Sequence, residues 1–255
     1  MVDIHTHILY GLDDGARTLE QSVAMVRMAG ANGTTDIVAT PHSNREYTFD
    51  PAAIDKRILE VREAVGEAPR IHRGCDLHLH MENIRDALEN PAKYAINHKR
   101  YVLVEFSDLL IPSTASDTFA LMLGAGMIPI VTHPERNALL RGRAEKLRAW
   151  VEMGCPIQVT AGSLLGAWGR NAARFSAALI GEGLAHFVAS DAHDETYRNT
   201  SLREAYEFAS ARWGAKTAQT LFVSNPKATL SGAAIERYAK PESPSRKKWY
   251  RRWWR

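Results

Sequence analysis

Two histidines one residue apart, His5 and His7, follow a short β-branched run at the start of the chain. Alternate side chains of an extended backbone point to the same side, so both imidazoles face one direction. Two imidazoles placed in this way bind a single transition-metal ion. Asp13 and Asp14 follow within one loop and add oxygen ligands. A histidine pair alone is also common on protein surfaces, so its meaning depends on the rest of the chain.

Apolar runs, loops and amphipathic helices recur along the chain, which is the pattern of parallel strands joined by helical crossovers. The predicted strands are residues 2–4, 36–39, 70–74, 101–104, 128–131, 157–159 and 186–189. The C-terminal ends of such strands share one face of a parallel α/β barrel, so the side chains that follow them converge. We therefore expect one α/β barrel with a site at that face.

The helices that connect these strands are predicted from their end signals. The first begins at Thr18, with Gln21 placed to complete a capping box, and ends at Gly30 and Gly33. Asp50-Pro51 opens the second as N-cap and first-turn proline. The apolar face of that second helix is Ile54, Ile58, Val61 and Val65. The last helices are expected near residues 201–212 and 215–223.

Residues that bind metals stand at or just after most of the predicted strand ends. The nine candidates are His5, His7, Asp14, His42, Asp76, Glu105, His133, Asp191 and His193. Each has an ordinary structural explanation by itself, as a surface pair, a core histidine or a salt-bridged carboxylate. Their joint occurrence favours a metal site. His72, His98 and His186 are assigned structural roles, and His78 and His80 are ambiguous, with a ligand role the less favoured interpretation.

This mixture of imidazole and carboxylate ligands suits Mn, Fe, Zn or Co better than a structural zinc site built of thiolates. Nine candidates exceed the needs of one ion and predict two or three divalent ions, with Glu105 and Asp76 as bridging carboxylates. Ions about 3.5–4 Å apart hold a hydroxide between them and polarise a phosphoryl oxygen. The predicted nucleophile is therefore a metal-bound hydroxide and not a side chain.

Two arginines follow predicted ligands closely: Arg136 comes three residues after His133, and Arg198 five after His193. A guanidinium pairs bidentately with phosphate oxygens, so both are predicted to bind phosphate, although a solvated surface arginine is the common case. Other phosphatase chemistry is excluded by spacing. A Cys-x5-Arg motif is absent, because Met81 and Ala161 stand at that distance from the only cysteines, Cys75 and Cys155. No Walker A loop and no dinucleotide Gly-x-Gly-x-x-Gly motif is present.

The composition predicts one globular domain, residues 1–240, followed by a flexible tail, residues 241–255. The chain has 255 residues, 45% hydrophobic and 24% charged. Six positive charges lie in residues 246–255, so residues 1–245 carry a net charge of −3, which disfavours a nucleic-acid-binding body. Two cysteines provide no disulfide framework, no apolar run is long enough to span a bilayer, and the first strand begins almost at Met1. We therefore expect a cytoplasmic protein without a signal peptide.

The tail combines basic and aromatic residues, which suits the interface of an anionic membrane. Its four aromatics are Trp249, Tyr250, Trp253 and Trp254. A disordered, solvated tail explains the same composition equally well. Membrane association through this segment is one of two open interpretations.

Several motifs stand in a characteristic order: His5-Thr6-His7, Asp13-Asp14-Gly15, Pro41-His42, Leu103-Val104-Glu105-Phe106-Ser107, His133-Pro134-Glu135-Arg136, Ala161-Gly162-Ser163 and Ser190-Asp191-Ala192-His193. In this order they resemble the PHP superfamily. More closely, they resemble the bacterial manganese-dependent protein-tyrosine phosphatases of capsule and exopolysaccharide loci. The resemblance extends from Met1 to about Gly232 and does not include the tail.

The resemblance implies a distorted seven-stranded TIM-like (β/α)7 barrel with a trinuclear, manganese-preferring site. It implies that the nine candidates are the metal ligands, that Arg136 and Arg198 bind the substrate phosphate, and that Asp14 and His42 share catalysis with them. The implied substrate is a phosphotyrosine protein, mainly a tyrosine autokinase that controls polysaccharide export. One departure is Asp76, where the family commonly has glutamate. The shorter carboxylate either bridges differently or leaves room for His78.

Other functions stay open from the sequence. A small-molecule phosphatase of the same superfamily, such as one for histidinol phosphate, shares the metal chemistry, although Asp13-Asp14-Gly15 and Ala161-Gly162-Ser163 favour the tyrosine phosphatase. A metal-binding scaffold that docks a membrane kinase is the non-enzyme alternative. The loop Leu109-Leu110-Ile111 packs either against a substrate ring or in the core. A homo-oligomer is open, and no nucleic-acid partner is expected.

Overall fold

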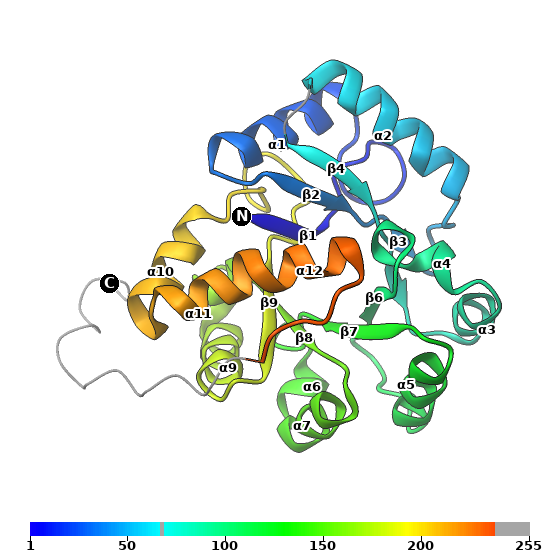
Figure 1. The fold of residues 1–255 in the computed structure, drawn as a ribbon, viewed down its shortest axis with the longest axis vertical. Helices are drawn as coiled ribbons and strands as arrows, with labels where there is room; N and C mark the ends of the chain where they lie inside the picture. Colours follow the sequence, from blue (N-terminus) through cyan, green and yellow to red (C-terminus); the bar gives the residue numbers. More distant parts are fainter. Residues whose placement is uncertain (67–68, 238–255) are drawn as a thin grey trace.

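Short parallel strands alternate with helices along the chain (Figure 1). The structure is a computed structural model and describes residues 1–66 and 69–237. Three strands form one sheet in the order β1-β2-β4, namely β1 (Val2–Thr6), β2 (Asp36–Ala39) and β4 (Arg70–Arg73). Six form the other in the order β3-β5-β6-β7-β8-β9, namely β3 (His42–Ser43), β5 (Asp76–His78), β6 (Tyr101–Glu105), β7 (Ile128–Thr132), β8 (Ile157–Thr160) and β9 (Ala185–Ala189). The predicted parallel α/β class is confirmed.

Two of the predicted strands each continue as a second short strand in the other sheet. β3 resumes the path of β2 after Pro41, which has no backbone N–H to donate to a ladder. β5 resumes the path of β4 after Gly74, where a Cβ would lie 2.8 Å from Val38 Cγ1. The sequence did not predict β3 and β5, because strands of two and three residues are too short for an alternation pattern. They carry the candidates His42 and Asp76.

The first and last strands meet beyond their C-terminal ends. His7 N donates to Ala192 O at 2.8 Å, and Asp191 N donates to His5 O at 2.9 Å. These bonds place His5, in β1, and His7, just after it, beside the residues that follow β9, although the two segments lie far apart in the chain.

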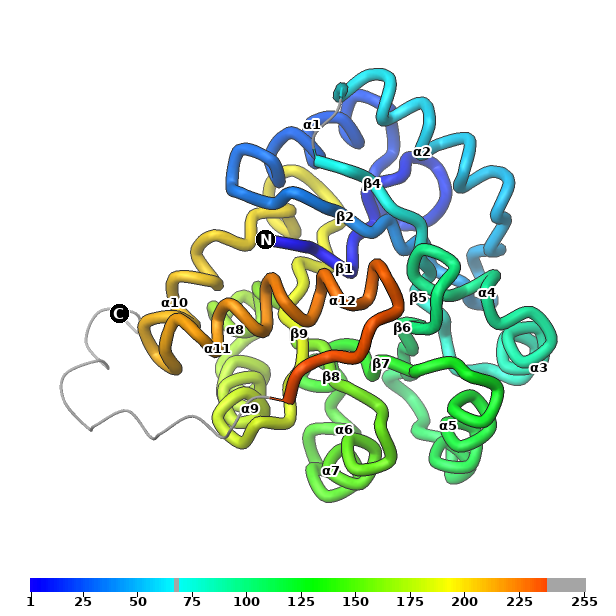
Figure 2. Tube along the Cα trace, in the orientation of Figure 1, coloured from blue at the N-terminus to red at the C-terminus, as the bar shows by residue number. Residues whose placement is uncertain are grey.

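The opposite, N-terminal ends of the strands are covered by helix α12 (Asn225–Ser231), which crosses in front of β1 and β9 in Figure 2. An inner apolar cluster of strand residues lies beneath it, and Leu230 and Ile235 pack against this cluster. Tyr101 Oη, at the start of β6, donates to Ala233 O at 2.7 Å. One end of the strands is thus closed by chain, and the C-terminal end is left for a site.

The two helices predicted from end signals are present. In α1 (Leu19–Ala31) Thr18 is the N-cap, but the Gln21 side chain accepts from Arg17 N and not from Thr18 N. Gly30 lies inside this helix against Pro69, and the left-handed residue after it is Gly33, with φ 87°. In α2 (Pro51–Val65) Asp50 caps the first turn as predicted.

The remaining helices cover the outer faces of the sheets. They are α3 (Met81–Glu89), α4 (Pro91–Tyr94), η1 (Ile96–His98), α5 (Ala115–Gly124), α6 (Ala138–Arg141), α7 (Ala144–Met153), α8 (Ala161–Leu164), α9 (Gly169–Gly181), α10 (Arg203–Trp213), α11 (Ala215–Gln219) and the π-helical turn η2 (Thr220–Ser224). The predicted helix near residues 215–223 runs on through η2 into α12. No helix among the described residues is long and apolar enough to cross a membrane. The predicted spacer and tail, residues 241–255, lie outside the described residues.

Candidate metal centre

The structure brings all nine candidate ligands together at the C-terminal ends of the strands. They form four overlapping groups in which one possible ligand atom of each member lies within 4.8 Å of the others. The groups are His7, Asp14, His42 and His193; His5, His7 and Asp76; His5, His133 and Asp191; and His42, Asp76 and Glu105. Four carboxylates and five imidazoles therefore share one small region.

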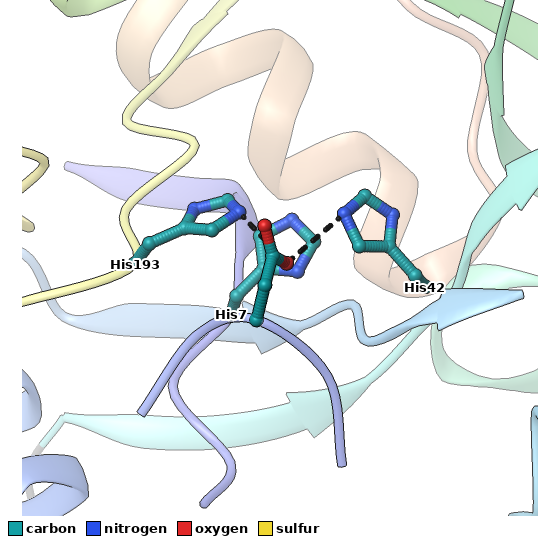
Figure 3. A group of neighbouring side chains, drawn as sticks. His7, His42 and His193 are labelled. Carbon is teal, nitrogen blue, oxygen red and sulfur yellow. Dashed lines mark ion pairs between the residues drawn. The ribbon is translucent and has the colours of Figure 1, made fainter. Parts of the chain in front are cut away.

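The most exposed group is centred on Asp14, which lies in the loop after β1. Its Oδ1 atom lies 3.4 Å from His42 Nε2 and 3.4 Å from His193 Nε2. Figure 3 shows the imidazoles of His7, His42 and His193 facing one another from three separate segments, with the carboxylate paired to His42 and His193 between them. This arrangement could hold one cation at the mouth of the site.

A deeper group surrounds the two histidines of the first strand. His5 Nε2 and His7 Nε2 lie 3.3 Å apart, and Asp191 Oδ1 lies 3.5 Å from each of them. Asp76 Oδ2 lies 3.6 Å from His5 Nε2. The predicted alternation along β1 therefore holds, because both imidazoles face the same point.

Glu105 lies between two other imidazoles. Its Oε2 atom lies 3.6 Å from His42 Nδ1, and its Oε1 atom lies 3.6 Å from His133 Nε2. Asp76 Oδ2 lies 3.1 Å from His42 Nδ1 as well as near His5. Each carboxylate therefore faces histidines from two groups, which is the geometry that a bridging ligand needs.

The chemistry of this donor set fits divalent cations. Asp76 is fully buried, and its Oδ1 atom has no hydrogen-bond partner within residues 1–66 and 69–237. Burying a carboxylate without partners costs several kcal/mol in general. Most of the imidazole–carboxylate contacts, at 3.4–3.6 Å, are longer than a charge-assisted hydrogen bond. Ligands spaced around a shared ion have this separation.

The charges of the cluster shift the pKa of its members strongly. Burial opposes a charge on His5, but Asp191 and Asp76 outweigh it and raise its pKa to about 9. Burial and the neighbouring charge of Asp76 raise the pKa of Glu105 to about 8. Burial lowers the pKa of His193 to about 4, with a further contribution from His7. A bound cation would relieve the repulsion between carboxylates that raises the pKa of Glu105.

Two residues outside the nine orient His5, in β1, and His7, just after it. Asp13 Oδ2 lies 2.6 Å from His7 Nδ1 and accepts from His42 N at 3.1 Å. Gln158 Oε1 lies 3.1 Å from His5 Nδ1. Each bond is made to the ring nitrogen that faces away from the cluster, which fixes the ring and frees the other nitrogen for a metal. Asp13 was expected to add an oxygen ligand, but its carboxylate contacts His7 Nδ1 and it belongs to none of the four groups, and nothing in the sequence singled out Gln158.

Sharp bends aim two of the candidates into the site. His133 follows β7 with φ 29°, and Asp191 follows β9 with φ 52°. Non-glycine residues rarely adopt positive φ, and such strain of about 1–3 kcal/mol is concentrated at functional sites. The side chains that leave these bends reach ligand candidates from other strands, His133 near Glu105 and Asp191 near His5.

The two predicted phosphate-binding arginines lie beside the cluster. Arg136 donates to Asp191 Oδ2, and Arg198 donates to the same oxygen at 3.0 Å. Asp191 thus presents one oxygen to His5 and His7 and the other to both guanidinium groups. Both arginines also lie over the ring of Trp168, with Cζ atoms 3.9 Å and 5.3 Å from its centroid. No motif or spacing in the sequence marks Trp168 as part of the site.

The other histidines have partners away from the cluster. His72 Nε2 lies 2.9 Å from Asp36, and His98 Nδ1 lies 2.9 Å from Arg73. His186 Nδ1 accepts from Ile157 N at 3.3 Å. His80 Nδ1 lies 2.9 Å from Glu82. His78 belongs to none of the four groups, so the structure gives it no place among the candidate ligands.

Two pockets open beside the cluster, and exposed apolar side chains lie in the loop that follows Glu105. A pocket of about 110 Å³ lies between Glu105, His133, Arg136 and Trp168, and a wider, open one of about 770 Å³ begins at Asp14 and His193. In the loop after β6, Leu109 is 91% exposed and Leu110 64% exposed, whereas Ile111 is buried. Of the two interpretations of this loop, packing in the core therefore applies to Ile111 and not to Leu109 or Leu110.

The arrangement of strands and helices is also found in distantly related enzymes of known structure. It superposes on the dihydropyrimidinase of Brevibacillus agri with a TM-score of 0.54, covering 93% of this chain and 73% of that one at 12% identity. At this identity the likeness concerns the fold alone, and it agrees with the predicted TIM-like class.

The chain belongs to the CpsB/CapC family of capsular polysaccharide synthesis, whose model matches residues 1–231. CapC of Staphylococcus aureus is 32% identical over 98% of this chain and 99% of its own length. The tyrosine-protein phosphatase YwqE of Bacillus subtilis is 33% identical over 97% and 98%. A chain from the crystal structures of YwqE and of CpsB from Streptococcus pneumoniae, described as metal-dependent tyrosine phosphatases, superposes with a TM-score of 0.87 at 33% identity, covering 96% and 100%. The predicted family is confirmed.

Proposed function

We propose that this chain is a metal-dependent protein-tyrosine phosphatase in which His5, His7, Asp14, His42, Asp76, Glu105, His133, Asp191 and His193 hold the metal ions. The observation that supports it best is the double use of Asp191. One of its oxygens faces the histidine pair of β1, and the other accepts from Arg136 and Arg198. A single carboxylate thus fixes the phosphate-binding groups at a set position relative to the metal ligands.

The residues of the chain have separate tasks in phosphomonoester hydrolysis. Arg136 and Arg198 bind the non-bridging phosphate oxygens and stabilise the negative charge of the transition state. Asp14 and His42, at the exposed edge of the cluster, take part in catalysis with them. When bound, divalent ions would generate the nucleophile from water and neutralise charge on the phosphoryl group. Asp13 and Gln158 keep the two imidazoles of β1 in orientation.

The proposed metal content is two or three ions, preferably Mn²⁺, with Fe, Zn or Co as alternatives. Carboxylate-rich sites with imidazoles suit these metals. Asp76 and Glu105, which each face histidines of two groups, are the proposed bridges. The shorter carboxylate of Asp76 already approaches both His5 and His42, so a bridging role does not require glutamate at this position.

The proposed substrate is a phosphotyrosine protein, with a bacterial tyrosine autokinase as the partner. YwqE and CpsB are named tyrosine-protein phosphatases, and the family is one of capsular polysaccharide synthesis. Exposed apolar side chains in the loops after β6 (Leu109, Leu110) and β9 (Tyr197), together with the open pocket at Asp14 and His193, suit a protein surface better than a small metabolite. Residues 1–240 are the proposed catalytic domain, in the cytoplasm. Contact of the tail with an anionic membrane remains a sequence-based hypothesis.

Phosphate release from a phosphotyrosine peptide tests the proposal directly. The protein is stripped with a chelator and assayed with and without added Mn²⁺, and His133→Ala serves as the variant that lacks one proposed ligand. We expect turnover only with metal, and a loss of metal affinity together with activity in the variant. Histidinol phosphate is assayed in parallel.

Two outcomes would contradict the proposal. A large preference for histidinol phosphate would assign the site to a small metabolite. An absence of turnover on every phosphomonoester, with metal shown to be bound, would favour the scaffold interpretation.

A further inference from the structure

The indole of Trp168 is the one aromatic ring, within the described residues, that both phosphate-binding arginines lie over. The Cζ of Arg136 lies 3.9 Å from the ring centroid and that of Arg198 lies 5.3 Å away. The arginines come from the loops after β7 and β9, and Trp168 comes from the loop between α8 and α9. Three separate segments therefore meet at this ring.

The backbone around Trp168 holds the indole in place. Ala167 N donates to Gly162 O at 2.9 Å, and Gly169 N donates to Gly166 O at 3.0 Å. Gly166 and Gly169 have φ values of 96° and 82°, which suit glycine. The indole Nε1 lies at contact distance from Gly162, where a Cβ would be 3.5 Å away. The ring thus packs on the tight turn of residues 162–169, which begins within the Ala161-Gly162-Ser163 motif.

The arginines need a further contact to hold them, because both guanidinium groups share one acceptor oxygen of Asp191. Both donate to Asp191 Oδ2, and Arg198 also donates to Asp191 O at 3.3 Å. When a phosphate competes for the same N–H donors, these bonds weaken. Ring-face contacts use no donor, so they persist when the donors turn to phosphate. They are stronger at partly buried sites, and the side chains of Arg136 and Arg198 are only 20% and 28% exposed.

We propose that Trp168 is a positioning residue of the phosphatase site, whose ring face holds the guanidinium groups of Arg136 and Arg198 over the metal cluster for phosphate binding. The inference rests on the proposed function, because it assigns Trp168 a role through the two phosphate-binding arginines. It also identifies the α8–α9 loop as part of the phosphate site, together with the loops after β7 and β9.

A second role for the same ring is stacking against the aromatic ring of phosphotyrosine. Trp168 is 40% exposed and lines the pocket beside Glu105 and His133. The two roles differ in what they require of the ligand. Support of the arginines affects any phosphate, including inorganic phosphate, whereas stacking affects only aryl esters. Inorganic phosphate is therefore the probe that distinguishes them.

The test is calorimetric titration of inorganic phosphate into the full-length, Mn²⁺-loaded protein, with metal content and melting temperature measured on each sample. Variants are Trp168→Leu, Trp168→Phe and Arg136→Ala. The control is Trp213→Leu, which removes an indole that lies 5.1 Å from Arg212 at the end of α10, away from the cluster. We expect Trp168→Leu to weaken phosphate binding about tenfold, the order expected from two cation–π contacts. Trp168→Phe keeps a ring face and loses about threefold or less, and the control is unchanged.

Each result has a distinct meaning. Unchanged phosphate affinity in Trp168→Leu, with Arg136→Ala clearly weakened, would overturn the inference and leave the proposed function intact. Turnover of a phosphotyrosine peptide is measured on the same variants. If Trp168→Leu lowers this turnover but leaves the affinity for inorganic phosphate unchanged, the ring is assigned to stacking and the inference is likewise overturned. If Arg136→Ala also binds phosphate like the wild type, the phosphate-binding role in the proposed function fails instead. Loss of bound Mn²⁺ in Trp168→Leu would assign the residue to the stability of the cluster and contradict the inference.

Discussion

Asp191 contacts both the histidine pair at the start of the chain and the two arginines beside the cluster. It is buried, its pKa is well below the usual range because His5 and Arg136 outweigh the cost of burial, and its backbone is bent to positive φ. A charged carboxylate in this position attracts cations from two sides. The candidate metal ligands and the arginines proposed to bind phosphate are thereby coupled through one residue.

At the residue scale, Arg136→Ala separates metal binding from phosphate binding. Among the described residues, the Arg136 guanidinium forms a hydrogen bond or ion pair with no candidate ligand other than Asp191, so we expect bound Mn²⁺ to be retained. The rate on phosphotyrosine peptide falls about 10²- to 10³-fold, the loss typical for removal of one group that stabilises transition-state charge. Metal analysis and steady-state kinetics on the same preparation check this. Wild-type kinetics would show that Arg136 does not bind the phosphate.

The sequence was sufficient to find the candidate metal ligands that the structure brings together, but not the residues that contact and orient them. His5, Glu105 and His133 stand out because histidines and carboxylates at strand ends form a recognisable pattern. Trp168 and Gln158 were not found, because their roles depend on contacts between segments far apart in the chain. A glutamine inside a strand and a tryptophan in a loop have no spacing that marks them.

At the element scale, the loop after β1 depends on a glycine. A Cβ on Gly15 would lie 2.1 Å from His7 O, and Ala16 N donates to the same oxygen at 3.0 Å. Gly15 N also donates to Asp13 Oδ1 at 2.9 Å. The loop therefore folds back onto the strand end so closely that only glycine fits, and this close approach delivers Asp13 and Asp14 to the histidines.

We expect Gly15→Ala to destabilise the protein by about 3 kcal/mol or more and to impair metal binding, because backbone atoms cannot yield to the added methyl. Gly124→Ala is the matched control. Its Cβ would meet nothing within 4 Å at the end of α5, so a change within about 1 kcal/mol is expected. Denaturant unfolding and metal titration of both variants provide the measurement. Equal stability of the two variants would contradict this account of the loop.

The elements themselves were predicted to within a few residues where an apolar run was long enough. The strands of residues 36–39 and 101–104 are β2 and most of β6. The two strands interrupted at Pro41 and Gly74 were not predicted to resume, because register in those stretches is set by neighbouring strands and not by local pattern. The continuation of α11 through a π-helical turn into α12 was also missed.

At the scale of the whole molecule, a buried histidine far from the cluster makes stability depend on pH. Burial lowers the pKa of His186 to about 4, helped by Arg237. Its Nδ1 accepts a hydrogen bond from Ile157 N at the start of β8, which a protonated ring cannot do. The unfolded chain, with a pKa near 6.5, binds the proton more readily than the folded one.

The folded state therefore loses stability as the pH falls from about 6.5 to about 4, by up to about 3 kcal/mol from this residue. The contribution is fully present above pH 6.5. In His186→Asn, whose amide oxygen still accepts from Ile157 N, this part of the acid destabilisation is expected to disappear. Urea unfolding of both proteins at pH 7, 5 and 4 measures the difference. Parallel pH profiles would show that His186 does not titrate in this range.

Barrel-like architecture was predictable as a whole, since alternation of parallel strands and helices has few compact solutions. The covering of the N-terminal ends of the strands by α12 was not. No pattern in residues 225–231 indicates that this helix covers the inner cluster. Its apolar contacts, such as that of Leu230, are made with residues distant in sequence. The tail beyond residue 237 is outside the described structure.

The meeting of His7 with Ala192 has a consequence for the order of events during synthesis. Ribosomes add about 5–20 residues per second, so about 10–40 s pass between the emergence of the first histidines and that of the last candidate ligands. Throughout this interval the histidines of β1 lack the residues after β9 that complete their surroundings. A full complement of metal can therefore be acquired only near the end of translation or afterwards. The metal content of the site therefore depends on the concentration of free metal ions around the nearly complete chain.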